Sequence, residues 1–91
     1  MNHDRKTAVV LGASPKPERY SNKAVAELIE HGCKVIPVNP GGMTIHDFPA
    51  VKQLSDIKEK VDVITVYVNP KISSPLQKEI IDLAPRLVIF N

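Results

Sequence analysis

A short run of small residues near the N-terminus, followed by cations, is the clearest chemical signal in the sequence. Gly12, Ala13 and Ser14 follow an apolar run, and Lys16 and Arg19 lie in the same loop. Small residues let the backbone approach a ligand closely, and the N–H groups that start a helix attract anions. The pattern predicts a site for a phosphate-bearing ligand. The alternative is an ordinary strand-to-helix connection with solvated charges.

The dinucleotide-binding fingerprint is incomplete in this loop. It needs glycine at three positions, of which this chain has Gly12, with Ser14 and Pro17 at the other two. NAD-binding domains also place a carboxylate after the second strand, where this chain has Asn39. An NADP site is not supported either, since no arginine lies near Asn39 in the sequence. These departures argue against NAD and NADP without excluding a dinucleotide.

The elements that would position this loop alternate between strands and helices. Four apolar runs have the length and composition of strands: residues 7–11, 34–38, 61–68 and 86–90. Because proline donates no ladder hydrogen bond, Pro37 weakens the second of these predictions. The run 45–48 is expected to be a short edge strand.

Two prolines determine where the first helix can begin. Pro15 and Pro17 cannot both lie inside a helix, so the helix starts after them. Ser21 or Asn22 is the expected cap, and Gly32 is placed to end the helix in the left-handed conformation.

The second helix is predicted from a local start signal. Ser74 stands at the cap, Pro75 at the first helical position, and Gln77 three residues on completes a capping box. Pro85 ends this helix. A shorter helix or turn is expected within residues 51–57.

Alternating strands and helices predict an α/β fold, a Rossmann-like open parallel sheet that is doubly wound with about five strands. Ninety-one residues make one domain, residues 1–91. Ligands of such sheets bind beyond the carboxyl ends of the strands, where the strand order reverses. The residues expected there are Gly12, Ala13, Ser14, Val38, Asn39, Pro40, Val68, Asn69, Pro70 and Asn91, with Lys16, Arg19 and Tyr20 from the first loop.

Three segments, residues 10–21, 31–40 and 62–70, resemble the small CoA-binding protein family. That family is similar to the nucleotide-binding domain of the succinyl-CoA synthetase alpha subunit, and the resemblance spans residues 6 to 91. It implies that coenzyme A lies across the strand ends. Its phosphates would face Gly12, Ala13, Ser14 and Arg19. Val38 and Pro40 would flank its adenosine portion. The facing wall of the site would be formed by Val68, Asn69 and Pro70.

One departure from the family lies after Asn91. Members usually continue through a Pro-Gly turn, another helix and a further strand, so either the chain is truncated or that unit is dispensable. One side of the expected pocket would then be missing. An open apolar face favours self-association, so a homodimer is one expected assembly, and association with a larger enzyme partner is the alternative.

Charge and composition argue against several classes of protein. The net charge is +2, with Lys and Arg interleaved with Asp and Glu, so neither nucleic acid nor a membrane surface is the expected partner. The N-terminal apolar run is too short for a signal peptide or a membrane span. The single cysteine, Cys33, fits a reducing compartment, so a cytoplasmic location is expected. Histidine and cysteine lack zinc-ligand spacing, and no metal is expected.

No residue pattern indicates a catalytic apparatus. Cys33 is expected at the end of the sheet remote from the strand carboxyl ends. His46 and Asp47 would point to opposite faces of a strand. We therefore expect a non-catalytic or regulatory module that binds coenzyme A or an acyl-CoA. The alternatives are an NAD(P)-type domain and a nucleotide-binding subunit of a CoA-dependent enzyme.

Overall fold

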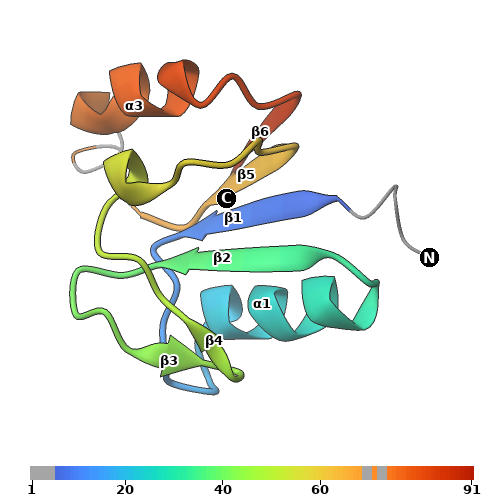
Figure 1. Ribbon diagram of the computed structural model, residues 1–91. Coiled ribbons are helices and arrows are strands. Elements are labelled where there is room, and N and C mark those ends of the chain that lie inside the picture. The colour runs from blue at the N-terminus through green and yellow to red at the C-terminus, as the bar shows by residue number, and fades with distance from the viewer. Residues whose placement is uncertain (1–5, 69–70, 72–73) are drawn as a thin grey trace.

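A four-stranded parallel sheet forms the centre of the computed structural model, which describes residues 6–68, 71 and 74–91 (Figure 1). The strand order is β2-β1-β5-β6. The strands are β1 (Thr7–Leu11), β2 (Lys34–Val38), β5 (Val63–Val66) and β6 (Leu87–Phe90), and the α-helices are α1 (Tyr20–Glu30) and α3 (Gln77–Asp82).

The connections wind the chain in two directions from β1. From β1 the chain crosses through α1 to β2, then returns past β1 to β5 and continues through α3 to β6. Because parallel crossovers are right-handed, this reversal moves the connections to the other face of the sheet. Figure 1 shows α1 and α3 on opposite sides of the sheet. The fold is therefore doubly wound, as predicted, and its order reverses between β1 and β5.

Alternate side chains of β1 enter two separate cores. Val9 and Leu11 pack in a cluster with Ile80 of α3, while Val10 packs in a cluster with Val25 of α1. Val9 and Val10 are both completely buried. A strand covered on both faces has a continuous apolar sequence, which explains why residues 7–11 are legible as a strand.

Pro37 is tolerated because β2 is an edge strand. Its carbonyl accepts a hydrogen bond from Val51 N at 2.9 Å, on the side away from β1. The N and O atoms of one strand residue point to the same side, so the missing N–H faces outward and costs no bond to β1. The prediction of β2 at residues 34–38 is confirmed with its bounds.

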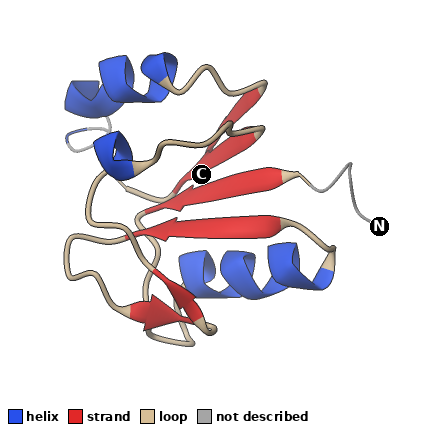
Figure 2. Cartoon of the chain, viewed as in Figure 1, coloured by secondary structure: helices blue, strands red, loops and turns tan. Residues whose placement is uncertain are grey.

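Residues 45–48 form no single edge strand, and this prediction is wrong. A two-stranded hairpin stands there, with β3 (Thr44–Ile45) and β4 (Phe48–Pro49) outside the main sheet (Figure 2). Its turn residues His46 and Asp47 have positive φ angles of 49° and 69°. Paired positive angles match the right-handed twist of a hairpin. Four of the five predicted strands therefore make the sheet.

Other element ends differ from prediction by a few residues. The N-cap of α1 is Arg19, ahead of the predicted caps, and the amide of Asn22 is bonded to Ser14 O. Gly32 follows the helix with a φ of +83°, as predicted. β5 ends at Val66, which pairs with Leu11 at the end of β1, two residues before the predicted strand end.

The second predicted helix starts with a tighter turn. A 3₁₀ turn, η2 (Ser74–Leu76), precedes α3, so Gln77 is the first residue of α3 and the predicted capping-box register is wrong. The short helix expected within residues 51–57 is the 3₁₀ turn η1 (Leu54–Asp56).

Candidate functional site

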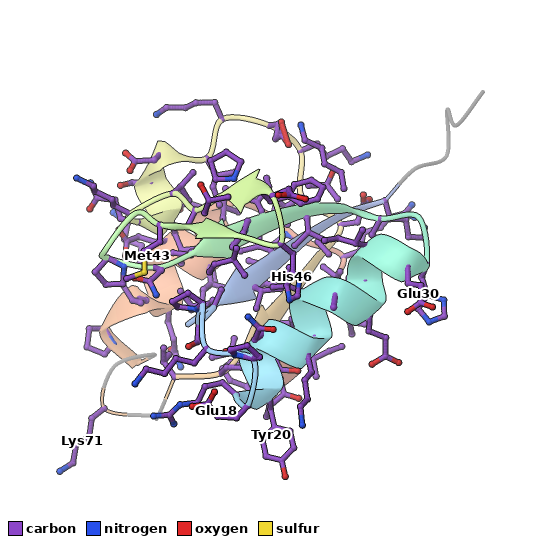
Figure 3. The ribbon with its side chains drawn as sticks, turned by 90° about the horizontal axis from the view of Figure 1, so that it is seen from below. Glu18, Tyr20, Glu30, Met43, His46 and Lys71 are labelled. Carbon is purple, nitrogen blue, oxygen red and sulfur yellow. The ribbon has the colours of Figure 1, made fainter. Side chains whose placement is uncertain are left out.

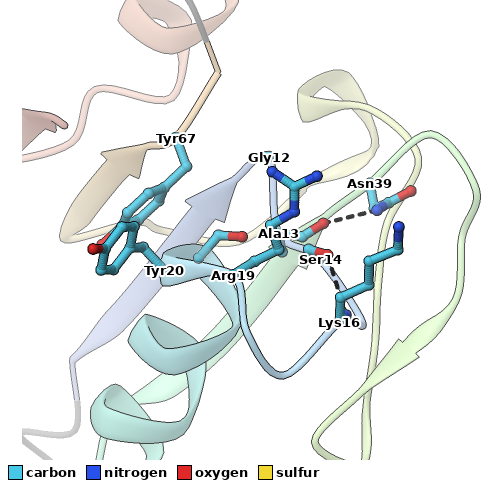
Figure 4. Close-up of a pocket in the computed structure, with 9 residues that line it drawn as sticks. Gly12, Ala13, Ser14, Lys16, Arg19, Tyr20, Asn39 and Tyr67 are labelled. Atoms are coloured by element: carbon cyan, nitrogen blue, oxygen red, sulfur yellow. Dashed lines mark hydrogen bonds between the residues drawn. The ribbon is translucent and has the colours of Figure 1, made fainter.

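A cleft of about 390 Å³ lies at the carboxyl ends of β1, β2 and β5 (Figure 4). The loop after β1 forms its floor, and the start of α1 forms one side. The residues that line it are Gly12, Ala13, Ser14, Lys16, Arg19, Tyr20, Ser21, Asn39 and Tyr67. The cleft thus lies where the strand order reverses, the place at which open parallel sheets bind ligands.

Gly12 brings the loop into close contact with the end of β5. Its φ is +88°, and a Cβ atom there would lie 2.7 Å from Val68 Cγ1. The N–H groups of Gly12 and Ala13 both donate to Val38 O at 3.1 Å. These two N–H groups are therefore engaged by the protein. The contribution of Gly12 is that its backbone can lie close to Tyr67 and Val68.

Two side-chain amides hold the carbonyl groups of the loop. Asn39 Nδ2 donates to Ala13 O at 2.7 Å, and Asn39 Oδ1 accepts from Gly41 N at 2.7 Å. Asn22 Nδ2 donates to Ser14 O at 2.8 Å. Both carbonyl oxygens are occupied by donors, so the loop keeps them from opposing an anion in the cleft.

The start of α1 has N–H groups without partners inside the helix, and two of its residues, Tyr20 and Ser21, line the cleft. The N–H groups of Tyr20, Ser21 and Asn22 precede the first hydrogen bond within the helix, from Lys23 N to Arg19 O. Within the described part of the chain, no side chain caps α1 and no acidic residue lies in its first turn. The positive end of the helix dipole is therefore left for an external anion.

The charged groups of the cleft are cationic. Lys16 and Arg19 line it, and both are exposed. Ser14 Oγ accepts from Lys16 N at 3.1 Å, which closes the loop beneath the lysine side chain. Exposed cations beside the N–H groups that start a helix are suited to phosphate groups.

Two lining residues were not predicted as site residues. Ser21 was expected to be a helix cap, and Tyr67 was expected to lie inside the strand predicted at residues 61–68. Ser21 is buried in the first turn of α1, and Tyr67 follows β5. Tyr20 is 79% exposed at the rim, with Lys23 Nζ 5.7 Å from its ring centroid. No signal in the sequence indicated Tyr67, because the predicted strand extended to residue 68, whereas β5 (Val63–Val66) ends just before this tyrosine.

Other predicted site residues lie beside the cleft. Val38, Pro40 and Val68 line a neighbouring apolar pocket of about 200 Å³, which shares Gly12 with the cleft. Its remaining lining comes from Leu11, Lys52, Gln53, Leu54 and Leu76. The cleft with its two cations and the apolar pocket thus meet at one glycine.

Among the described residues, the predicted site residue Asn91 lines neither the cleft nor the apolar pocket. Asn69 and Pro70 lie outside the described residues. Asn91 Nδ2 donates to Thr65 Oγ1 at 2.7 Å and to Val66 O at 3.1 Å. The Asn91 amide nitrogen thus joins the ends of β5 and β6.

Neither a metal centre nor a membrane span is found among the described residues. In residues 6–68, 71 and 74–91, no group of three or more His, Cys, Asp and Glu side chains could hold a metal ion. None of the helices in those ranges has the length and apolar character needed to cross a bilayer.

Comparison with known proteins identifies the family. A family model described as a CoA binding domain matches residues 6–91. The chain belongs to the CoA binding domain family. The matched range includes all the elements that form the cleft of this CoA binding domain.

A curated relative is the uncharacterized protein YneT of Bacillus subtilis, to which this CoA binding domain is 34% identical over 65 residues. The match covers 68% of this chain and 46% of YneT. The chain therefore matches less than half the length of this relative.

Solved structures share the fold of this CoA binding domain. A crystal structure of an uncharacterized protein has a TM-score of 0.86 and 32% identity, covering 96% of this chain and 71% of that one. A hypothetical protein from Pyrococcus horikoshii OT3 has a TM-score of 0.81 and 36% identity, covering 92% of this chain and 58% of that one.

Proposed function

We propose that this chain binds coenzyme A or an acyl-CoA through its adenosine-phosphate portion and acts as a non-catalytic, regulatory or carrier module. The observation that carries the proposal is the membership of the family together with an uncapped helix start at the strand ends. The phosphates would contact Lys16, Arg19 and the N–H groups that start α1. The adenosine would enter the apolar pocket beside Val38 and Pro40.

The cleft favours coenzyme A over a dinucleotide. A ribose diol held in the NAD manner needs a carboxylate after β2, and Asn39 stands there with both ends of its amide bonded to backbone. Both polar atoms of the Asn39 side chain are therefore already hydrogen-bonded within the protein and are not available to a ribose.

Calorimetric titration with coenzyme A, dephospho-CoA and NAD tests the ligand. We expect coenzyme A to bind more tightly than NAD, and dephospho-CoA to bind more weakly than coenzyme A because it lacks one phosphate. Tighter binding of NAD would overturn the assignment, and no binding of any of the three would remove the proposed function.

Arg19→Ala is expected to weaken the binding of coenzyme A by about 1.5–3 kcal/mol, because it removes a charge-assisted hydrogen bond to phosphate. That corresponds to about 10- to 150-fold in Kd, measured by the same titration. Arg86→Ala is the matched control: Arg86 is exposed and precedes β6, at the end of the sheet remote from the cleft. An Arg19→Ala protein with the affinity of the control would exclude Arg19 from the site.

A further inference from the structure

Two hydrogen bonds in series connect the β3–β4 hairpin to the loop after β1. His46 Nε2 lies 2.7 Å from Asn22 Oδ1, and Asn22 Nδ2 donates to Ser14 O at 2.8 Å. Figure 3 shows the His46 side chain directed toward α1. The hairpin, the first turn of α1 and the floor of the cleft are thus joined through side chains.

The two partners of Asn22 determine which atom donates to which. Since Asn22 Nδ2 donates to a carbonyl, its Oδ1 must be the atom that faces His46, and an amide oxygen can only accept. His46 Nε2 must therefore carry a hydrogen. Asn22 is only 5% exposed, so water has little access to replace this donor.

The peptide unit that Asn22 holds can affect an anion in one way only. Ser14 is followed by Pro15, so this unit has a carbonyl oxygen and no N–H group. If the carbonyl turned toward the cleft, it would place a partial negative charge against phosphate. Its bond to Asn22, which does not line the cleft, keeps it turned away.

The backbone at His46 is also unusual. Its φ of 49° is one that a non-glycine residue seldom adopts, and glycine or asparagine would fit there with less strain. Histidine adds what those residues lack, a side chain long enough to reach the buried amide of α1.

We propose that His46 is a positioning residue for the phosphate-binding loop, acting through Asn22 on the carbonyl of Ser14. This inference rests on the proposed function for its effect on affinity. His46 does not touch the ligand. It fixes the orientation of the Asn22 amide, and the Asn22 amide fixes the loop.

His46→Gly tests the proposal, because glycine suits the positive φ and removes the donor without straining the hairpin. We expect coenzyme A affinity to fall about 3- to 10-fold, the effect of one hydrogen bond. His46→Gln, whose amide can donate to Asn22 Oδ1, should restore affinity to within about 2-fold. Asp47→Gly is the matched control, a neighbouring turn residue with positive φ, and should bind as the unaltered protein does.

An NMR readout without ligand separates the two proposals. In a ¹H–¹⁵N spectrum of the full chain, His46→Gly should shift the side-chain NH₂ of Asn22 and the backbone amide of Ser14, whereas Asp47→Gly should not. Unchanged signals, or an unchanged affinity in a protein that binds coenzyme A, would overturn the role of His46. Shifted signals in a chain that does not bind coenzyme A would leave the positioning intact and reject the proposed function.

Discussion

Replacing Gly12 with alanine is expected to destabilise the fold by about 2–5 kcal/mol and to abolish binding of coenzyme A. The left-handed backbone at φ +88° costs a residue with a Cβ about 1–2 kcal/mol. Overpacking against Val68 adds about 1–3 kcal/mol. The valine cannot easily yield, because its χ1 is restricted and the backbone of Tyr67 and Val68 lies 3.2–3.3 Å from the new atom. Urea denaturation measures the stability, and calorimetry measures the binding.

Gly32 provides a matched control for that experiment. Its φ is +83°, nearly the same, but no atom lies within 4 Å of the position that a Cβ would take. Gly32→Ala should therefore cost only the conformational part, about 1–2 kcal/mol, and leave affinity unchanged. Equal losses of stability in the two variants would mean that steric contact with Val68 adds nothing to the cost of a Cβ at position 12.

Asn39→Asp is expected to lower the affinity for coenzyme A by about 100-fold. A carboxylate a few ångströms from a phosphate costs about 3 kcal/mol at an effective dielectric constant of about 20, which is about 100-fold in Kd. The same change replaces the donor to Ala13 O with an acceptor, which frees that carbonyl to move. Calorimetric titration of the variant measures the loss. NAD should not gain affinity, since the new carboxylate opposes Ala13 O.

Asn39→Ala separates the charge from the lost hydrogen bond. It removes the donor without adding a charge, so a loss of about 3- to 10-fold is expected. The additional loss in Asn39→Asp should shrink as salt is raised, because salt screens interactions between exposed charges. If the two variants bound equally at low salt, no phosphate would lie near Asn39.

The sheet could be predicted closely because its strands end at residues with local signals. Gly12 and Asn39 mark the ends of β1 and β2, and both strands were predicted with their bounds. The hairpin could not be predicted, because the turn at His46 and Asp47 adopts positive φ angles without glycine. Without a glycine to mark the turn, residues 45–48 resemble a single short strand.

The residues that line the cleft could be predicted better than the hydrogen bonds that hold its loop. Gly12, Arg19 and Asn39 line one cleft, as expected from the strand ends. The hydrogen bonds of Asn22 join residues that are 8 and 24 positions apart, and no local pattern indicates them. Propensity also suggested that Asn22 caps the helix, whereas the fold uses its amide to hold a neighbouring carbonyl.

The outward edge of β2 has a consequence for how this molecule can assemble. Pro37 removes one donor there, and Val51 bonds both to Pro37 O and to Asn39 N, which blocks that edge against a further strand. On β6, Leu87 and Phe90 are exposed at the opposite margin of the described sheet. Within the described part of the chain, the two margins of the sheet therefore differ: the edge of β2 is closed to a further strand, whereas β6 carries exposed apolar side chains.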